Sequence, residues 1–507
     1  MNKTHLFFGS LAIGASLAAS RVLSARSKSP KAACTHDSYA AIDTYIVEQM
    51  QRLHIPGASL AIIEGDRVVH QRGFGLARPG GETPVALTPF FIGSLTKSIT
   101  AMAVMQLVEA GKMELDALVQ HYLPWFRVAD PQASAQITVR HLLNQTSGFP
   151  SLASNLVLAE LDNTPGANER QVRALSTLKL SHPVGEVVEY CNLNYNVLGL
   201  IIESVTGETY PDYIQKHIFT PLEMSHSYTA KTPAQQNGLA MGYRHWFGLP
   251  VPAFDLPVPL GSLASGQLIS CAEDISHYLM AHMNGGRYNG TQILSPAGMD
   301  ELHRGEKQLF AFGESVGRYA MGWFDRDIGN IRTLSHGGNV PDFSAFMSLI
   351  PEQNKGMVIL FNADPYGLPM ITDEIGTNLT VILAGRQPES IKLDFIQWIF
   401  RCLPLLPLLQ LWGVVTTLEK LNRWQKDPAS RPKGGKLWFQ HILLPLIPNL
   451  SLAATLAYLR TSRLINFMDL FMPDLAWIGR ISGGFAGIWA SVRTRLILQT
   501  LRKTGHL

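Results

Sequence analysis

The sequence predicts a mixed α/β unit over residues 35–385, followed by about three membrane-spanning helices within residues 394–507. Three observations lead to this fold class. Strand patterns occur at both ends of the first region, helix and loop patterns fill its middle, and the composition becomes strongly apolar after residue 394. A single sheet built from the two ends of the region, with a helical part inserted between them, accounts for the first two observations.

The strand patterns share runs of β-branched, aromatic and other apolar residues, and they lie at residues 58–64, 67–74, 332–335, 343–350 and 356–362. Gly65 and Asp66 separate the first two runs, which predicts a hairpin. An amphipathic helix is expected near residues 39–53. A second helix is expected over about residues 94–110, ending at Gly111 as helices often do.

Both ends of the chain indicate a membrane or an export route. Lys3, an apolar run and small residues before Arg21 predict that residues 1–25 are a signal peptide or an N-terminal anchor. The tail has apolar stretches at residues 395–418, 437–459 and about 475–492, each near the roughly 20 residues that cross a bilayer. The alternative is that these stretches are buried or interfacial helices of a soluble domain.

Basic residues predict the orientation of the tail. Six lysines and arginines lie between the first two stretches, only two between the second and third, and four after the third. By the positive-inside rule, the first loop and the C-terminus are then cytoplasmic, and the α/β unit is extracytoplasmic. We therefore expect a multi-pass membrane protein that contacts lipid through its C-terminal helices.

Composition excludes several other classes of protein. Charged residues make up 16% of the chain, below the roughly 25% of typical soluble domains, which agrees with a region in lipid. The net charge of +3 is too small to indicate a nucleic-acid partner. The four cysteines are far apart and no HExxH pattern occurs, so neither a disulfide framework nor a metallohydrolase is expected.

An S-x-x-K pattern, Ser94 to Lys97, begins the second predicted helix. This spacing places the two side chains one turn apart on the same face. The Lys97 ammonium beside the Ser94 hydroxyl lowers the cost of removing the hydroxyl proton, and the helix N-terminus stabilises the negative charge that develops. The pattern is that of a nucleophilic Ser94; taken alone, it also fits a serine that caps the helix and a lysine that is a solvated surface charge.

Other motifs follow in a fixed order. They are residues 137–148 (ITVRHLLNQTSG), Tyr190-Cys191-Asn192 before a helix near residues 197–207, and His336-Gly337-Gly338 after a strand. Together with Ser94–Lys97, they resemble the class C β-lactamase and penicillin-binding-protein-like serine hydrolase family over residues 38–385. The resemblance implies a β-lactamase/transpeptidase-like α+β sandwich, with an antiparallel sheet flanked by helices and a helical subdomain.

The resemblance also implies roles for the first two motifs. Tyr190 is the general base that takes the Ser94 proton and returns it to the leaving group. A free tyrosine titrates near pH 10, so Lys97 is expected to supply the cation that this role needs. Asn192 orients Lys97 and contacts the substrate.

The third motif of the family is K-T-G, with H-x-G as a variant, and His336 stands at its first position. Gly338 lets the backbone approach the substrate, and the amide N–H groups of Ser94 and Asn339 form the oxyanion hole. A literal K-T-G at residues 503–505 follows the last apolar stretch, so we interpret it as coincidence.

Histidine at this position is only partly charged near pH 7, whereas a permanent cation suits the carboxylate of penicillins. We therefore expect hydrolysis of a small-molecule or peptide amide or ester, such as a D-amino-acid peptide or ester related to the cell wall. The reaction passes through a Ser94 acyl-enzyme and requires no metal or organic cofactor. Two alternatives stay open: a β-lactamase that acts on antibiotics, and a penicillin-binding sensor or binding module that acylates without turnover.

Overall fold

The computed structural model describes residues 37–311, 314–328, 330–392, 394–431 and 434–502. The predicted signal peptide or anchor at residues 1–25 and the K-T-G triplet at residues 503–505 lie outside these residues. Contacts divide the chain into two compact units. Unit 1 contains Met1–His245 and Leu249–Ile391, and unit 2 contains Trp246–Gly248 and Lys392–Leu507.

The sheet of unit 1 has eight antiparallel strands in the order β2-β1-β14-β13-β12-β11-β10-β9. The strands are β1 (Gly57–Glu64), β2 (Arg67–Gly75), β9 (Lys307–Ala311), β10 (Glu314–Ala320), β11 (Trp323–Ile328), β12 (Ile331–Val340), β13 (Phe343–Ile350) and β14 (Lys355–Phe361). β1 pairs with β14 in the register Ala58 opposite Phe361, so strands from the two ends of the unit lie side by side in the sheet. The predicted α/β fold with an antiparallel sheet is confirmed.

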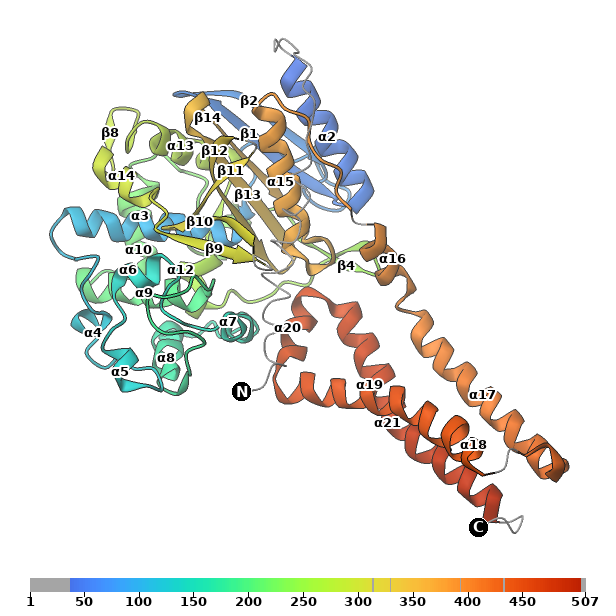
Figure 1. The fold of residues 1–507 in the computed structure, drawn as a ribbon. Coiled ribbons are helices and arrows are strands. Elements are labelled where there is room, and N and C mark those ends of the chain that lie inside the picture. Colours follow the sequence, from blue (N-terminus) through green and yellow to red (C-terminus); the bar gives the residue numbers. More distant parts are fainter. Residues whose placement is uncertain (1–36, 312–313, 329, 393, 432–433, 503–507) are drawn as a thin grey trace. The chain divides into compact units, whose positions relative to one another are not determined.

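The central strands are apolar on both faces, and helices cover both faces (Figure 1). Helices α2 (Asp37–Leu53) and α15 (Pro369–Leu383) pack together, and α15 also packs on β12 and β13. Helix α13 (Ala272–Met283) packs on β1 and β14. A sheet with one face in water has strands in which apolar and polar residues alternate. β13 and β14 are instead continuous apolar runs, so both of their faces must be buried.

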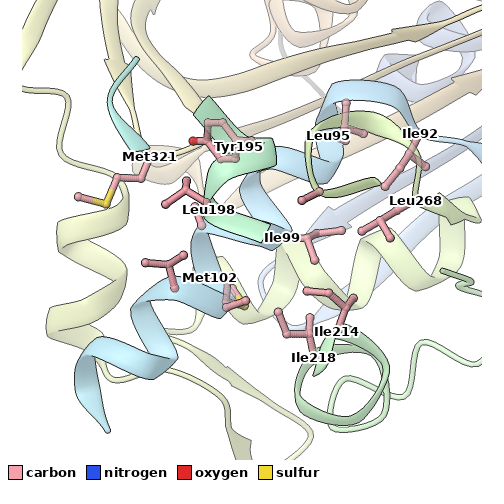
Figure 2. Packing of buried hydrophobic residues seen from close by; sticks show 14 of the residues in the cluster. Ile92, Leu95, Ile99, Met102, Tyr195, Leu198, Ile214, Ile218, Leu268 and Met321 are labelled. Atoms are coloured by element: carbon pink, nitrogen blue, oxygen red, sulfur yellow. The ribbon is translucent and has the colours of Figure 1, made fainter. Parts of the chain in front are cut away.

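The helical region is built around α3 (Thr96–Glu109), which is buried for most of its length. The other helices of the region are α4 (Val119–Tyr122), α5 (Pro131–Ser134), α6 (Val139–Leu143), α7 (Ser151–Leu158), α8 (Ala167–Ala174), α9 (Asn192–Thr206), α10 (Tyr210–Ile214), α11 (Lys231–Gln236), α12 (Leu263–Gly266) and α14 (Pro296–Leu302). Figure 2 shows Ile99 and Met102 of α3 in the same apolar cluster as Leu198 of α9. This packing fixes the position of the first turn before α3.

Two element boundaries differ from the sequence-based expectations. The helix expected from residue 94 begins with a separate 3₁₀ turn, η2 (Gly93–Leu95), before α3. His336–Asn339, expected at the start of a strand, lie within β12, where they pair with residues 344–347 of β13. Two glycines in a row carry little strand preference, so the pairing with β13 decides the conformation here.

Unit 2 is helical. Its helices are α16 (Asp394–Cys402), α17 (Leu405–Lys426), α18 (Gly435–Leu437), η9 (Trp438–Leu443), α19 (Leu444–Thr461), α20 (Leu464–Phe471) and α21 (Pro473–Arg502). Among the described residues, one continuous helix, Trp438–Thr461, is long and apolar enough to span a membrane. Residues 395–402 and 405–426 pass the same test only as a pair bent by 49°.

The prediction of about three spans is therefore not confirmed, since the described residues hold one candidate span, or two if the bent pair is one span. The third stretch does form a helix, α21, of 30 residues. Arg480, Ser482 and four glycines interrupt its apolar residues, and a helix with that composition lacks the sustained hydropathy of a span.

The two basic segments of the tail lie at one end of unit 2. Leu421 and Trp424 of α17, Ile442 of η9, and Ile497 and Leu501 of α21 form one apolar cluster. The Arg493 guanidinium of α21 donates to Thr417 Oγ1 at 3.3 Å and to the His441 carbonyl. This arrangement agrees with the expectation that both segments face the same side; which side of a membrane that is stays a prediction.

Candidate active site

Ser94 lies in η2, and Lys97 lies in the first turn of α3, so the spacing brings their side chains together. Lys97 Nζ is 2.9 Å from Ser94 Oγ, 2.6 Å from Asn192 Oδ1 and 2.6 Å from the Ser265 carbonyl oxygen. Lys97 is fully buried, whereas Ser94 is partly exposed. Three oxygen atoms replace the water that the buried Lys97 side chain loses, and the serine hydroxyl stays within reach of a substrate.

Tyr190 lies beside the Lys97 side chain. The Lys97 Nζ atom is 4.8 Å from the centre of the Tyr190 ring, and the Tyr190 side chain interacts with that of Ser94. Burial raises the pKa of Tyr190 well above its usual value, while the interaction with Ser94 lowers it in part. Burial also lowers the pKa of Lys97. Both shifts favour an uncharged amine and an uncharged phenol in the resting site.

The segment that resembles a family signature, residues 137–148, holds the second motif in place. Gln145 Oε1 accepts a hydrogen bond from the Cys191 amide at 2.9 Å and another from Asn194 Nδ2. Gln145 has a φ of +59°, which is uncommon for a residue other than glycine and marks a tight turn. Ser154 Oγ accepts from the Asn192 amide at 2.9 Å. Asn192 is thereby fixed at the start of α9, with its side-chain oxygen on Lys97.

Strand β12 lies beside Ser94 along its unpaired edge. Its register with β11 ends at Ser335, whereas its register with β13 continues to Val340. Over residues 336–340, β12 therefore pairs with β13 on one edge, and among the described residues no strand pairs with its other edge. The opposite edge of β12 faces η2.

Glycines allow the close approach of β12 and η2. A Cβ atom on Gly338 would lie 2.1 Å from the Ile92 carbonyl oxygen and 3.0 Å from the Ser94 amide nitrogen. A Cβ atom on Gly93, which has a φ of +53°, would lie 2.4 Å from the Asn339 amide nitrogen. The predicted oxyanion-hole amides of Ser94 and Asn339 thus come from two backbone segments in direct contact.

The side chain of Asn339 has a different use from its backbone. Asn339 Nδ2 donates to Asp364 Oδ1 at 3.0 Å and to Thr372 Oγ1 at 3.3 Å. It therefore ties β12 to the segment before α15 and to α15 itself.

His336 is 2% exposed and lies among aromatic rings. Its ring is 6.0 Å from that of Tyr190, 6.2 Å from Tyr319 and 5.1 Å from Phe324, between centres. Burial, followed by the charge of Lys97, lowers the pKa of His336 to about 3. His336 is therefore neutral at pH 7, and the partial charge expected from the sequence is absent because the site excludes water.

A cavity of about 400 Å³ adjoins the far end of β12. Val340 and Phe343, together with Phe91 and Gln267, form its wall nearest to Ser94. Leu158, Leu161 and the loop over residues 253–259 form much of the remaining wall. The edge of β12 thus has an aromatic, polar end at His336 and an apolar pocket beyond Asn339.

Sequence reasoning missed several residues around Ser94. Ser265 contributes a carbonyl oxygen, so its residue type carries no signal. Tyr319 and Phe324 on strands are typical of ordinary core residues, and Asp373 on α15 belongs to no recognisable motif. Only the tertiary structure brings these residues to the site.

A G-x-S-x-G match elsewhere in the chain does not form a second reactive centre. Gly-Glu-Ser-Val-Gly at residues 313–317 matches G-x-S-x-G, which marks a nucleophile only at a strand-to-helix turn. Ser315 lies within β10, pairs with Phe310 of β9 and bonds to Gln308. In the part of the chain that the structure describes, no group of three or more His, Cys, Asp or Glu side chains is placed to hold a metal ion.

Comparisons with known proteins agree with this geometry. The sequence model of the family described as Beta-lactamase matches residues 42–379. The chain is 31% identical to "Protein flp" of Staphylococcus aureus (strain MW2) over 355 residues, which cover 68% of this chain and 67% of that protein. It is 29% identical to "Penicillin-binding protein 4" of Amycolatopsis lactamdurans, over 66% of this chain and 88% of that protein.

Two solved structures share the fold. The octameric penicillin-binding protein homologue from Pyrococcus abyssi gives a TM-score of 0.61 at 29% identity, covering 69% of this chain and 78% of that chain. A class C β-lactamase in complex with cefoxitin gives a TM-score of 0.55 at 21% identity, covering 69% of this chain and 99% of that chain. Because the family match extends over most of unit 1 and includes every residue of the site above, the chain belongs to the β-lactamase family of serine hydrolases.

Proposed function

We propose that this protein hydrolyses an amide or ester through an acyl-enzyme formed on Ser94. The observation that carries the proposal is the position of Lys97 Nζ, which is 2.9 Å from Ser94 Oγ and 4.8 Å from the centre of the Tyr190 ring, beside the glycine edge of β12. A nucleophile, a proton acceptor and two backbone donors within one site are the requirements of acyl transfer.

Acylation begins when Ser94 Oγ attacks the carbonyl carbon of the substrate. Lys97 and Tyr190 act as one proton acceptor: the neutral amine takes the phenol proton of Tyr190, and the phenolate so formed takes the Ser94 proton, which leaves a phenol beside an ammonium. The amides of Ser94 and Asn339 donate to the oxyanion. Tyr190 then protonates the leaving group, and water attacks the acyl-enzyme with Tyr190 again accepting the proton.

The surroundings of Ser94 give the substrate a direction. Tyr190 and His336 lie at one end of the exposed edge of β12, so the leaving group that Tyr190 protonates occupies this end. The cavity bounded by Val340 and Phe343 lies at the other end and suits an apolar acyl group. D-Amino-acid peptides and esters derived from the cell wall are substrates of this kind.

A β-lactamase remains the second candidate, supported by the likeness to penicillin-binding proteins. The neutral state of His336 disfavours it, since a penicillin carboxylate finds no permanent cation there. A sensor that acylates without turnover requires that water be kept from the acyl-enzyme. The partly exposed Ser94 and Tyr190 argue for turnover.

We also propose that unit 2 anchors the protein in the cell membrane as a multi-pass segment, with unit 1 on the extracytoplasmic side. The candidate span Trp438–Thr461, the bent pair of helices and the clustered basic residues support this placement. A cell-wall substrate is available only on that side.

Activity-based labelling with a matched serine control tests the hydrolase. The detergent-solubilised wild type, Ser94→Ala and Ser315→Ala are treated with a fluorescent phosphonate and a fluorescent penicillin. Turnover of a chromogenic ester, a D-Ala-D-Ala peptide and a cephalosporin is followed in parallel. We expect phosphonate labelling and ester or peptide turnover that require Ser94 and not Ser315. Rapid cephalosporin turnover would indicate a β-lactamase, and penicillin labelling without turnover would indicate a sensor.

A further inference from the structure

A carboxylate occupies the side-chain space of Gly337, in the strand that lines the site. A Cβ atom on Gly337 would lie 1.7 Å from Asp373 Oδ1 and 2.7 Å from Asp373 Cγ. Asp373 lies on α15, which packs against β12. The third motif therefore presents a neutral histidine, a glycine and the carboxylate of another element at the end of β12 where the proposed leaving group lies.

This carboxylate lacks the partners that a buried acid normally has. Among the residues that the structure describes, Asp373 Oδ1 is buried and has no hydrogen-bond partner. Arg326 on β11 is the cation whose charge acts on Asp373, but the two form no ion pair, and the Arg326 guanidinium lies 4.5 Å from the centre of the Phe324 ring. A polar atom buried without a partner is costly and calls for an explanation, and beside a catalytic site a ligand or a catalytic role is such an explanation.

Asp373 also acts on the group that protonates the leaving group. Its negative charge is one of the causes that raise the pKa of Tyr190. The other titratable group nearby, Asp364, accepts a hydrogen bond from Asn339 Nδ2 at 3.0 Å. The leaving-group end of the site therefore carries an unpaired negative charge and a cation that stacks on an aromatic ring.

We propose that Asp373 is a specificity-determining residue that favours substrates with a positively charged leaving group and disfavours those with a carboxylate there. The substrate class is then an apolar acyl group joined by an amide or ester bond to an amine-bearing leaving group. This inference rests on the proposed function. It differs from penicillin recognition in the sign of the charge that the subsite accepts.

Three thioesters with one acyl group test the inference. They carry the same phenylpropanoyl group, and their thiols end in a dimethylammonium, an isopropyl or a carboxylate group of matched length. Release of the thiol is followed for the full-length wild type, Asp373→Asn and Glu374→Gln. Glu374 is the control because it lies next to Asp373 on α15, while the charges that act on it are those of Glu389 and Arg52.

For the wild type we expect kcat/KM to decrease from the ammonium to the neutral to the carboxylate thioester, by on the order of tenfold per step. Asp373→Asn should bring the three values within about threefold of one another, and Glu374→Gln should leave the order unchanged. Because each comparison is a ratio within one enzyme preparation, a variant that folds in reduced yield gives the same answer.

The outcomes separate the inference from the function on which it rests. If the wild type hydrolyses none of the thioesters, the proposed hydrolase function fails, and the inference with it. If turnover occurs but Asp373→Asn leaves the ratios unchanged, only the inference is overturned. A wild-type preference for the carboxylate thioester that disappears in Arg326→Gln would assign the subsite to the guanidinium and would also overturn it.

Discussion

The two units of the chain place their apolar side chains in opposite positions. In unit 1 the large apolar residues are in the core, and the polar groups around Ser94 are buried and mostly hydrogen-bonded. In unit 2 large apolar residues point outward: Trp412 is 66% exposed, Ile447 60% and Ile488 69%. Most of the basic residues of unit 2 lie at residues 420–436 and 493–502, in the two segments that flank the apolar cluster containing Trp424 and Ile497.

This difference agrees with the proposal that unit 1 lies in water and unit 2 in lipid. A water-soluble unit loses stability when such residues are exposed, whereas a unit in lipid buries them against acyl chains. Chemistry and location are then separate properties of the chain: substitutions in unit 1 should change turnover, and substitutions in unit 2 should change where the protein is found.

The largest effect is expected for Lys97. The substitution Lys97→Met removes the proton acceptor and leaves Asn192 Oδ1 and the Ser265 carbonyl without their donor. We expect turnover of the chromogenic ester to fall by about 10⁴-fold, as for other members of a catalytic set. The fraction of protein in the membrane should not change. Lys112→Met, an exposed lysine after α3, is the control, and equal losses in both variants would contradict the assignment.

Two residues of equal exposure test the second half of the comparison. Ile447 in α19 is 60% exposed, and Val85 in unit 1 is 59% exposed. If unit 2 lies in lipid, Ile447→Asp should cost about 3 kcal/mol of insertion and reduce the membrane fraction sharply. Val85→Asp replaces an apolar residue that is exposed to water, so the membrane fraction should not change. The distribution between pellet and supernatant after alkaline extraction measures both, and equal behaviour of the two variants would remove the argument for a lipid-facing surface.

The fold of unit 1 could be predicted because its signals are local or continuous. β13 and β14 are uninterrupted apolar runs, and Gly65 with Asp66 marks the hairpin between β1 and β2. The number of membrane spans could not be predicted, because α21 has the length of a span and a composition near the limit. Small and charged residues within an apolar helix decide that case.

The candidate site was predictable where its residues lie in short motifs. The structure brings Ser94, Lys97, Tyr190 and Asn192 together, and their catalytic roles stay predictions. The charge state of His336 was not predictable, because it depends on burial among rings from β10 and β11. Asp373 reaches the site only through the packing of α15 on the sheet, which no local pattern encodes.

Gly338 tests how closely the backbone must approach Ser94. In Gly338→Ala the new Cβ meets the Ile92 carbonyl, a backbone atom that cannot rotate away, so β12 and η2 must separate. We expect turnover to fall by about 10²-fold, as for misplacements near 1 Å. Gly337→Ala meets only the end of the Asp373 side chain and should lose less. The kcat of the chromogenic ester measures both, and a larger loss in Gly337→Ala would place the critical contact elsewhere.

His336 gives the smallest effect and tests whether the site of unit 1 is as dry as its burial indicates. Its pKa is lowered to about 3, below the value near 6.5 of an unfolded chain. Between these values the unfolded state binds a proton that the folded state does not, so stability falls as pH decreases from 6.5. At pH 5 this difference lowers the free energy of unfolding by about 2 kcal/mol.

Unfolding of the solubilised protein in denaturant, followed at pH 7 and pH 5, should show that His336→Asn loses less stability than the wild type. The buried His282 and His303, whose pKa values are also lowered, should keep the remaining acid sensitivity in that variant. Equal losses in the variant and the wild type would mean that His336 is already solvated, and the subsite beside Ser94 would then be open to water and to anionic substrates.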